Sequence, residues 1–287
     1  MSLVTALTVT PSRLSALLET CVVVGGRAPR MEIEALISPP VLRRGADPEE
    51  AKVDELIREA QRLGLAELDG PEIVLTTDGT DASKDLRNWL WPRLLSDESA
   101  AAISQEEFPL LLCWLLMQDP YEGLEWAEGP DSVSAVFGDA ASTRETLRNK
   151  SVFQQFLYWA RFLGFVTWVK TNQGTRVVPL PTAALERVLD DPTLAPGYRG
   201  TADGFVRRVG ELCPVLESGK VRERVESGSS FRSYDLNSTV SPSLGLALLA
   251  LEARGRIQLL LESDSRTTLS LVPRGRGSRQ FTHTKVV

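Results

Sequence analysis

The side chains that most often carry enzyme chemistry are scarce in this sequence. His283 is the single histidine among 287 residues, and it lies in a C-terminal stretch that we expect to be a mobile tail. A Ser-His-Asp or Cys-His arrangement needs a positioned imidazole as its general base, so it would have to use this residue. The GxxxxGK(S/T) signature of P-loop NTPases is absent. The sequence therefore predicts no catalytic residues and no cofactor.

One short stretch has the residue types of a metal-dependent nuclease. Glu50-Ala51-Lys52 matches the Glu-x-Lys part of a pattern in which carboxylates hold a divalent metal ion. Such carboxylates are expected on adjacent strands, whereas this stretch falls inside an apparent helix, where charged residues normally form a solvated face. A nuclease stays open as a third hypothesis, which predicts metal-dependent cleavage that is lost when Glu50 or Lys52 is removed. We expect no metal site and no enzyme activity.

The cysteines and the apolar runs indicate the cellular compartment of the protein. Cys21, Cys113 and Cys213 lie far apart and form no CxxC pair, which predicts neither a disulfide framework nor a zinc site. The longest apolar run, 109–117, is much shorter than the roughly 20 residues that cross a bilayer. The N-terminus lacks the features of a secretory signal. We expect a cytoplasmic protein without a membrane partner.

The spacing of apolar residues predicts one unit three times over: an amphipathic helix, a glycine that ends it, and two short strands. The three helices end at Gly64, Gly164 and Gly255. The expected strand pairs are 65–68 with 73–76, 165–169 with 175–178, and 257–261 with 267–272. In the first pair the connecting Asp69-Gly70 is a strong hairpin signal.

A helix, a glycine stop and a hairpin form the second half of a winged-helix unit, whose third helix often enters the major groove while the hairpin contacts the backbone. The earlier helices of the three units are expected at 11–24, 30–37, 84–95, 105–117, 202–216 and 221–226, with Ser104 as the N-cap of the fourth. The predicted class is mainly α with short β-hairpins (α+β), arranged as tandem winged-helix domains over 1–80, 81–180 and 181–287. A single α+β domain of unrelated helices and hairpins remains the alternative.

Charge is divided unevenly along the chain. Residues 1–150 carry a net charge of −12 and residues 151–287 a net charge of +6. The first half repels polyanions and the second half tolerates them, so a nucleic-acid contact belongs to the second half. Many proteins reach a charge of this size without binding DNA, which keeps the opposite interpretation open.

The helix that ends at Gly164 carries residue types suited to reading DNA. Its apolar stripe between 153 and 163 defines a core side, and basic and amide side chains gather opposite. Arginine pairs with guanine and Asn or Gln with adenine, while Ser or Tyr can hold a phosphate. The predicted DNA-binding residues on this helix are Arg144, Arg148, Lys150, Ser151, Gln155 and Tyr158. A merely solvated basic face is the alternative.

Two further groups are candidates for contacts with the phosphate backbone. The hairpin after the same helix supplies Lys170, Asn172 and Arg176. The end of the chain, from residue 266 onwards, is predicted to be a flexible cationic arm or a solubilising end; its candidates are Arg274, Arg276 and Arg279. Each phosphate that such an arm neutralises makes binding more salt dependent.

The third helices of the other two units are less suited to DNA. The first, 49–62, is mostly acidic and repels phosphates. The third, 243–253, has Glu252 as its one charged residue, which suits burial against a partner or another domain. The tryptophans Trp89, Trp91 and Trp114 fall at core spacing and predict packing rather than base stacking.

Four stretches of the chain together resemble the DpdG family. They are 3–11 with the helix that follows, the break at Ser38-Pro39, the helix end at 62–65, and the block Tyr158-Trp159-Ala160-Arg161-Phe162-Leu163-Gly164-Phe165. DpdG is an accessory protein of bacterial gene clusters that insert 7-deazaguanine derivatives into DNA and restrict DNA that lacks them. The resemblance spans the chain. It implies a role in phage defence beside helicase (ATPase) and nuclease subunits, with no catalytic residues to carry over.

Two functions follow from these patterns. The first is a non-enzymatic tandem winged-helix subunit of a DNA-restriction system, which touches duplex DNA through its middle domain and docks a partner protein through its acidic N-terminal half. The second is a protein-protein adaptor that resembles the winged-helix subunits of SMC-type complexes and does not bind DNA. The DNA sequence, the partner and the oligomeric state are left open.

Overall fold

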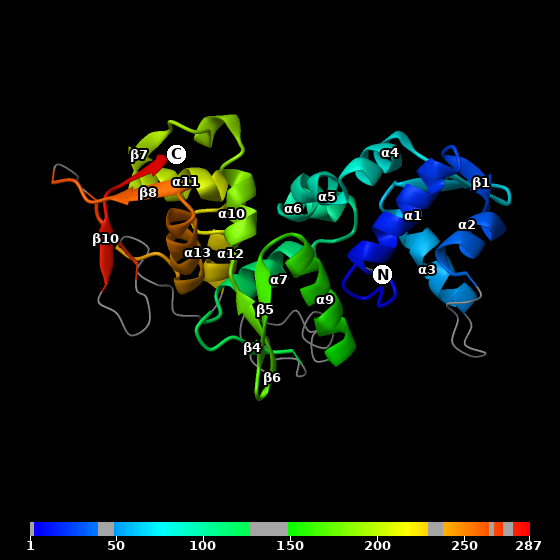
Figure 1. Ribbon diagram of the computed structural model, residues 1–287, viewed down its shortest axis with the longest axis horizontal. Coiled ribbons are helices and arrows are strands. Elements are labelled where there is room, and N and C mark those ends of the chain that lie inside the picture. Colours follow the sequence, from blue (N-terminus) through cyan, green and yellow to red (C-terminus); the bar gives the residue numbers. More distant parts are fainter. Residues whose placement is uncertain (1–2, 40–48, 127–148, 229–237, 264–266, 272–277) are drawn as a thin grey trace.

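Three three-stranded antiparallel sheets, each built from one stretch of the chain, divide the helices into three units, and the third unit has a further two-stranded sheet (Figure 1). The computed structural model describes residues 3–39, 49–126, 149–228, 238–263, 267–271 and 278–287. Helices dominate and the sheets are short, which confirms the predicted α+β class. Within these ranges no helix combines the length and the apolar character that crossing a bilayer requires.

The elements follow one another in the same kind of order in each unit. The first unit comprises α1 (Pro11–Val23), β1 (Arg27–Pro29), α2 (Arg30–Ile37), α3 (Glu49–Arg62), β2 (Ala66–Asp69), β3 (Glu72–Leu75) and α4 (Thr77–Lys84). The middle unit comprises α5 (Leu86–Leu94), α6 (Asp97–Ala102), α7 (Glu107–Leu116), β4 (Leu124–Glu125), α9 (Lys150–Phe162), β5 (Val166–Thr171) and β6 (Gly174–Pro179). The third unit comprises α10 (Thr182–Val188), η3 (Pro192–Leu194), β7 (Arg199–Thr201), α11 (Ala202–Leu212), α12 (Lys220–Gly228), α13 (Pro242–Ala253), β8 (Ile257–Leu260), β9 (Leu269–Leu271), β10 (Arg279–Phe281) and β11 (His283–Val286).

The three sheets share one strand order. In each, the first strand of the unit pairs antiparallel with the last strand, which also pairs with the strand that follows the long helix. The orders are β1-β3-β2, β4-β6-β5 and β7-β11-β8. The short strands β1, β4 and β7 were not predicted, because two or three extended residues carry too little periodicity to be recognised.

The glycines that end α3, α9 and α13 do so in the same way, as predicted. Gly64, Gly164 and Gly255 have φ of 74°, 90° and 72°, a left-handed conformation that glycine adopts without steric cost. Each makes a Schellman end, in which the residue after the glycine donates to the carbonyl five positions back. These bonds measure 2.8 Å from Leu65 to Ala60, 3.0 Å from Phe165 to Ala160 and 3.0 Å from Arg256 to Leu251.

In every unit, the end of the last strand is hydrogen-bonded to the backbone just after the glycine that ends the long helix. The residue just after that strand donates its N–H to the carbonyl of the residue just after the glycine. The bonds run from Thr76 to Leu65 at 3.2 Å, from Leu180 to Phe165 at 3.0 Å, and from Val287 to Arg256 at 3.0 Å. The repeat recognised in the sequence is therefore also a repeat of backbone hydrogen bonding.

The predicted strand pairing of the third unit is wrong. β8 pairs with β11, whose register sets Ile257 opposite Val286, and not with 267–272. The intended partner, β9, pairs instead with β10. Both β9 and β11 alternate buried with less buried residues, so the local pattern could not distinguish the correct partner from the nearer one.

Two details of the middle unit also differ from expectation. The helix expected at 84–95 is present as α5 but begins at Leu86, because Asp85 leaves the helical conformation and caps α5 by accepting from the Asn88 N–H at 2.9 Å, while Lys84 ends α4. Ser104 does not cap α7: it has φ 54°, and α7 begins after Glu106 without a side-chain cap. The predicted packing of the tryptophans is confirmed, since Trp114 is fully buried and Trp91 stacks on Phe165 at 5.5 Å.

Candidate nucleic-acid interface

The helix α9 presents a narrow exposed stripe. Asn149 caps it, accepting from the Ser151 N–H at 3.0 Å. The predicted apolar stripe is confirmed as core: Phe153, Phe156, Leu157, Ala160 and Leu163 are all buried. Four polar residues of the helix stay exposed: Lys150, Ser151, Tyr158 and Arg161. Three of these four were predicted as DNA contacts.

Gln155 was predicted to read bases, and this prediction is wrong. Its side chain is 2% exposed. The Nε2 atom donates to three backbone carbonyls of the segment that precedes α1, namely Leu3 at 3.2 Å, Ala6 at 3.0 Å and Val9 at 2.6 Å. The sequence periodicity placed Gln155 opposite the core of its own unit, where the N-terminal segment of the chain packs. A side chain that points away from the core of its own unit can therefore be buried by a segment of another unit.

Several predicted contacts lie outside the described residues. Arg144 and Arg148 precede Asn149, and Arg274 and Arg276 fall within 272–277. Their predicted roles stay predictions.

Three aromatic side chains pack around the exposed stripe. The Tyr158 ring, 40% exposed, lies 5.3 Å from the Trp126 ring and 5.4 Å from the Trp168 ring, both edge to face. Trp126 and Trp168 are themselves 4.6 Å apart. We call these three residues the aromatic cluster. It fixes the Tyr158 ring against the sheet β4-β6-β5, so its hydroxyl is carried on a rigid support.

Of the three residues predicted on the hairpin, two are exposed and one forms an ion pair within the fold. Lys170 and Asn172 are exposed at the tip where β5 turns into β6. Arg176 lies further back and pairs with Glu125 of β4 at 3.0 Å. Its charge is therefore offset by a neighbouring carboxylate, which weakens it as a phosphate contact. The sequence could not show this, because the short strand β4 was not recognised.

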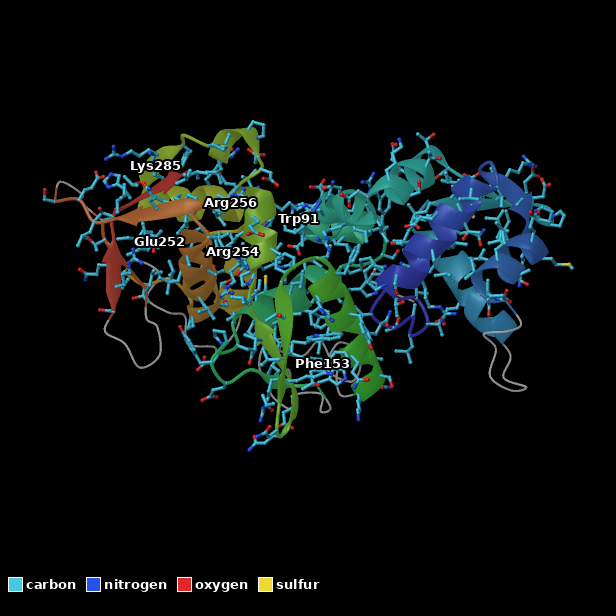
Figure 2. All side chains as sticks on the ribbon, viewed as in Figure 1. Trp91, Phe153, Glu252, Arg254, Arg256 and Lys285 are labelled. Carbon is cyan, nitrogen blue, oxygen red and sulfur yellow. The ribbon has the colours of Figure 1, made fainter. Side chains whose placement is uncertain are left out.

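The end of the chain is not a flexible arm where it is described. Arg279 lies in β10 and forms a two-pronged ion pair with Glu252 of α13, one arm of which measures 2.7 Å. His283 and Lys285 lie in β11, between β7 and β8. Figure 2 shows Glu252 with Arg254 at the C-terminal end of α13, beside this sheet. Arg279 is thus a structural residue, because its guanidinium already has a carboxylate partner.

The pair of Glu252 and Arg279 predicts a pH dependence of stability. Burial alone raises the pKa of Glu252, but the bonds from Arg279 and from the Leu259 N–H outweigh it, and the net pKa is lowered. A carboxyl whose pKa is lower in the folded state stabilises the fold above its unfolded pKa, near pH 4, and loses that contribution as the pH falls through its folded pKa. We expect Glu252→Gln to cost about 1 kcal/mol at pH 7 and almost nothing below about pH 3. Urea unfolding of both proteins across that range measures the difference, and a cost that does not change with pH contradicts the assignment.

The residue types considered for enzyme chemistry lie apart from this surface. Glu50 and Lys52 fall in α3, as expected, rather than on adjacent strands. The three cysteines are buried and free, and burial raises the pKa of the Cys21 thiol to about 11 and the pKa values of Cys113 and Cys213 further. Over the described residues, no group of three or more His, Cys, Asp or Glu side chains is arranged to hold a metal ion.

Two arginines next to the stripe were missed by the sequence analysis. Arg161 follows Tyr158 by three positions on α9, and Arg87 reaches the same region from α5. The Arg161 guanidinium lies 4.1 Å from the centre of the Trp168 ring and that of Arg87 lies 5.0 Å from the Phe162 ring. Arg161 could have been found from its helical spacing to Tyr158. Arg87 could not, because it comes from a distant part of the sequence.

Comparison with known proteins places the chain in a family without adding a structural relative. A family model described as DpdG-like matches residues 1–265. No curated protein and no solved structure matches the chain.

Proposed function

The chain belongs to the DpdG-like family, and from this premise we propose that it is a non-enzymatic subunit of a bacterial DNA-restriction or phage-defence system. In this proposal the middle unit contacts duplex DNA through the exposed stripe of α9 and the tip of the β5–β6 hairpin. The acidic first unit docks a partner protein, such as a helicase (ATPase) or nuclease subunit of the same system.

The order of elements supports the interpretation of each unit as a winged helix. A winged helix has a short first strand, a long helix and a two-strand wing, with the first strand paired to the last strand of the wing, which is central in the sheet. The orders β1-β3-β2, β4-β6-β5 and β7-β11-β8 fit this arrangement, and the shared glycine ends fit a threefold repeat. The proposed domains are 1–80, 81–180 and 181–287, one for each sheet.

The distribution of open cations supports the choice of the middle unit. Lys150 and Lys170 are exposed at the start of α9 and on the hairpin, and no described carboxylate pairs with either of them. In the third unit the corresponding helix, α13, is mostly buried, and its Ser243 hydroxyl donates to the Leu116 carbonyl of the middle unit at 2.5 Å. In the first unit, α3 is acidic. Exposed lysines on the long helix and on the hairpin of one unit favour phosphate contacts at that surface.

The test is duplex binding by charge-reversed variants. We expect Lys150→Glu with Lys170→Glu to weaken binding of a 20-base-pair duplex by about tenfold or more at 0.1 M salt, and to lower the salt dependence, because two phosphate contacts are lost. A fluorescence anisotropy titration at several salt concentrations measures both. The matched control is Lys84→Glu with Lys220→Glu, which changes the net charge equally at exposed sites on α4 and α12. Equal weakening by the two pairs contradicts a specific surface.

A protein-protein adaptor, resembling the winged-helix subunits of SMC-type complexes, is the second candidate. It is favoured because Gln155, Arg176 and Arg279 already have hydrogen-bond or ion-pair partners within the fold. Fewer side chains are therefore available to contact DNA than the sequence predicted. The two functions differ in the same titration combined with a solution mass measurement. A stable dimer that does not bind DNA supports the adaptor.

A further inference from the structure

A groove opens where the first unit meets the middle unit. It has a volume of about 560 Å³ and is lined by α1, α5 and α9. Its polar and aromatic lining comes from Thr10, Ser12, Arg87, Tyr158, Arg161 and Phe162. The groove adjoins the exposed stripe of α9, since Tyr158 and Arg161 belong to both.

The two arginines of this groove differ from most others in the molecule. Arg93, for example, covers the Trp89 ring at 4.0 Å but also pairs with Asp78 at 3.5 Å. Arg87 and Arg161 lie over aromatic rings in the same manner, yet among the described residues no carboxylate pairs with either. A guanidinium that stacks by its face keeps its N–H edge available for an acceptor. The groove therefore holds two positive charges whose donors point to no acidic partner of the fold.

The remaining polar groups of the groove are hydroxyls. The Thr10 and Ser12 hydroxyls lie 3.3 Å apart at the beginning of α1, and the Tyr158 hydroxyl is carried by the aromatic cluster. Guanidinium and hydroxyl donors together match the oxygens of a phosphate, which accepts several charge-assisted hydrogen bonds at once.

We propose that this groove binds a phosphate group through Arg87 and Arg161, and that in the complex with DNA it holds a phosphate of the backbone. The second statement depends on the proposed function; the first does not. Because Thr10 and Ser12 belong to the first unit and Arg161 to the middle unit, the site is complete only when the two units are packed together. The same chemistry serves a free nucleotide, which the experiment distinguishes from DNA.

The test uses a double variant, Arg87→Gln together with Arg161→Gln, which we call the groove variant, and compares it with a control variant. Three probes are used: a 20-base-pair duplex, dGMP and a tetraglutamate peptide. The control combines Arg58→Gln and Arg207→Gln, two exposed arginines that do not line the groove. We expect the groove variant to lose about tenfold or more in duplex affinity and to lower the slope of log affinity against log salt by nearly 2. The control should match the wild type. Arg161→Lys, which keeps the charge and loses the planar fork, should lose affinity severalfold and provides the test if the double variant does not fold.

The outcomes separate the two proposals. If the wild type binds the duplex and the groove variant binds it equally well, the groove inference is wrong and the DNA function stands. If the wild type binds no duplex, the DNA function is wrong, and dGMP binding followed by NMR decides the groove: binding that the groove variant loses supports a nucleotide phosphate site, and no binding overturns it. Tetraglutamate binding at least as tightly as dGMP overturns the phosphate assignment in favour of an acidic peptide.

Discussion

Replacing Arg222 with alanine should lower the free energy of unfolding by about 3–5 kcal/mol, because it leaves buried carboxylates without their cation. Arg222 lies on α12 and is 2% exposed, with its Nε 2.5 Å from Glu226 Oε1. Glu217, 1% exposed, is the second acidic neighbour. Burial alone lowers the pKa of Arg222, but these two carboxylates outweigh it and the net pKa is raised. The arginine is therefore charged in the folded state, pairs with Glu226 and offsets the charge of Glu217.

The position of this charge explains the size of the effect. Helix α12 of the third unit packs on α7 of the middle unit, where the Cys113 thiol donates to the Val215 carbonyl at 3.5 Å. A charge left without its partner at this junction disturbs two units together. Urea unfolding measures the loss. The control is Arg224→Ala, two positions away on the same helix, whose guanidinium is 53% exposed and pairs with Asp97; we expect less than about 1 kcal/mol there. A similar cost for both variants contradicts the buried-charge argument.

The second large effect is expected at Gln155. Gln155→Glu changes almost no volume, but it replaces the amide donor with a carboxylate facing the Leu3, Ala6 and Val9 carbonyls. The three carbonyls lose their donor, and a buried negative charge meets them without a partner. We expect the free energy of unfolding to fall by about 3 kcal/mol or more at pH 7.

The neighbouring residue offers a matched control. Gln154 is half-buried, and its Nε2 donates to the Trp126 carbonyl at 3.2 Å. Gln154→Glu makes the same chemical change beside solvent, and we expect a cost of about 1 kcal/mol or less. Thermal or urea unfolding of both variants gives the comparison. If Gln155→Glu is as stable as wild type, the N-terminal segment does not dock as described.

Through this docking of the N-terminal segment, the middle unit contacts the first unit as well as the third. Leu3, Val4, Ala6 and Val9 are fully buried, and the Leu3 N–H donates to Gln105 Oε1 at 2.9 Å. Two buried glutamines of the middle unit thus satisfy the backbone of a segment that begins the chain. This arrangement also forms one wall of the groove, since Thr10 follows directly. Loss of Gln155 should therefore disturb the groove as well as stability.

Periodicity and turn chemistry were sufficient to locate the repeated elements. The apolar stripe of α9, the hairpin at Asp69-Gly70 and the left-handed glycines at Gly64, Gly164 and Gly255 were all recognised from the sequence, because each depends on residues within one turn or one hairpin. The short strands and the partner of β8 were not. They depend on pairing between residues far apart in the chain, for which a few extended residues give no signal.

What the sequence determined by itself is most of the helices, the first two hairpins, the threefold repeat of glycine-ended helices and the placement of basic residues around α9. The tertiary structure alone decided which of those polar residues remain open: it buried Gln155 under the N-terminal segment, paired Arg176 with Glu125 and Arg279 with Glu252, and brought Arg87 beside Arg161. The physical reason is that helical periodicity reports the side of a helix that faces its own core, whereas exposure and charge pairing depend on every other segment that packs against it.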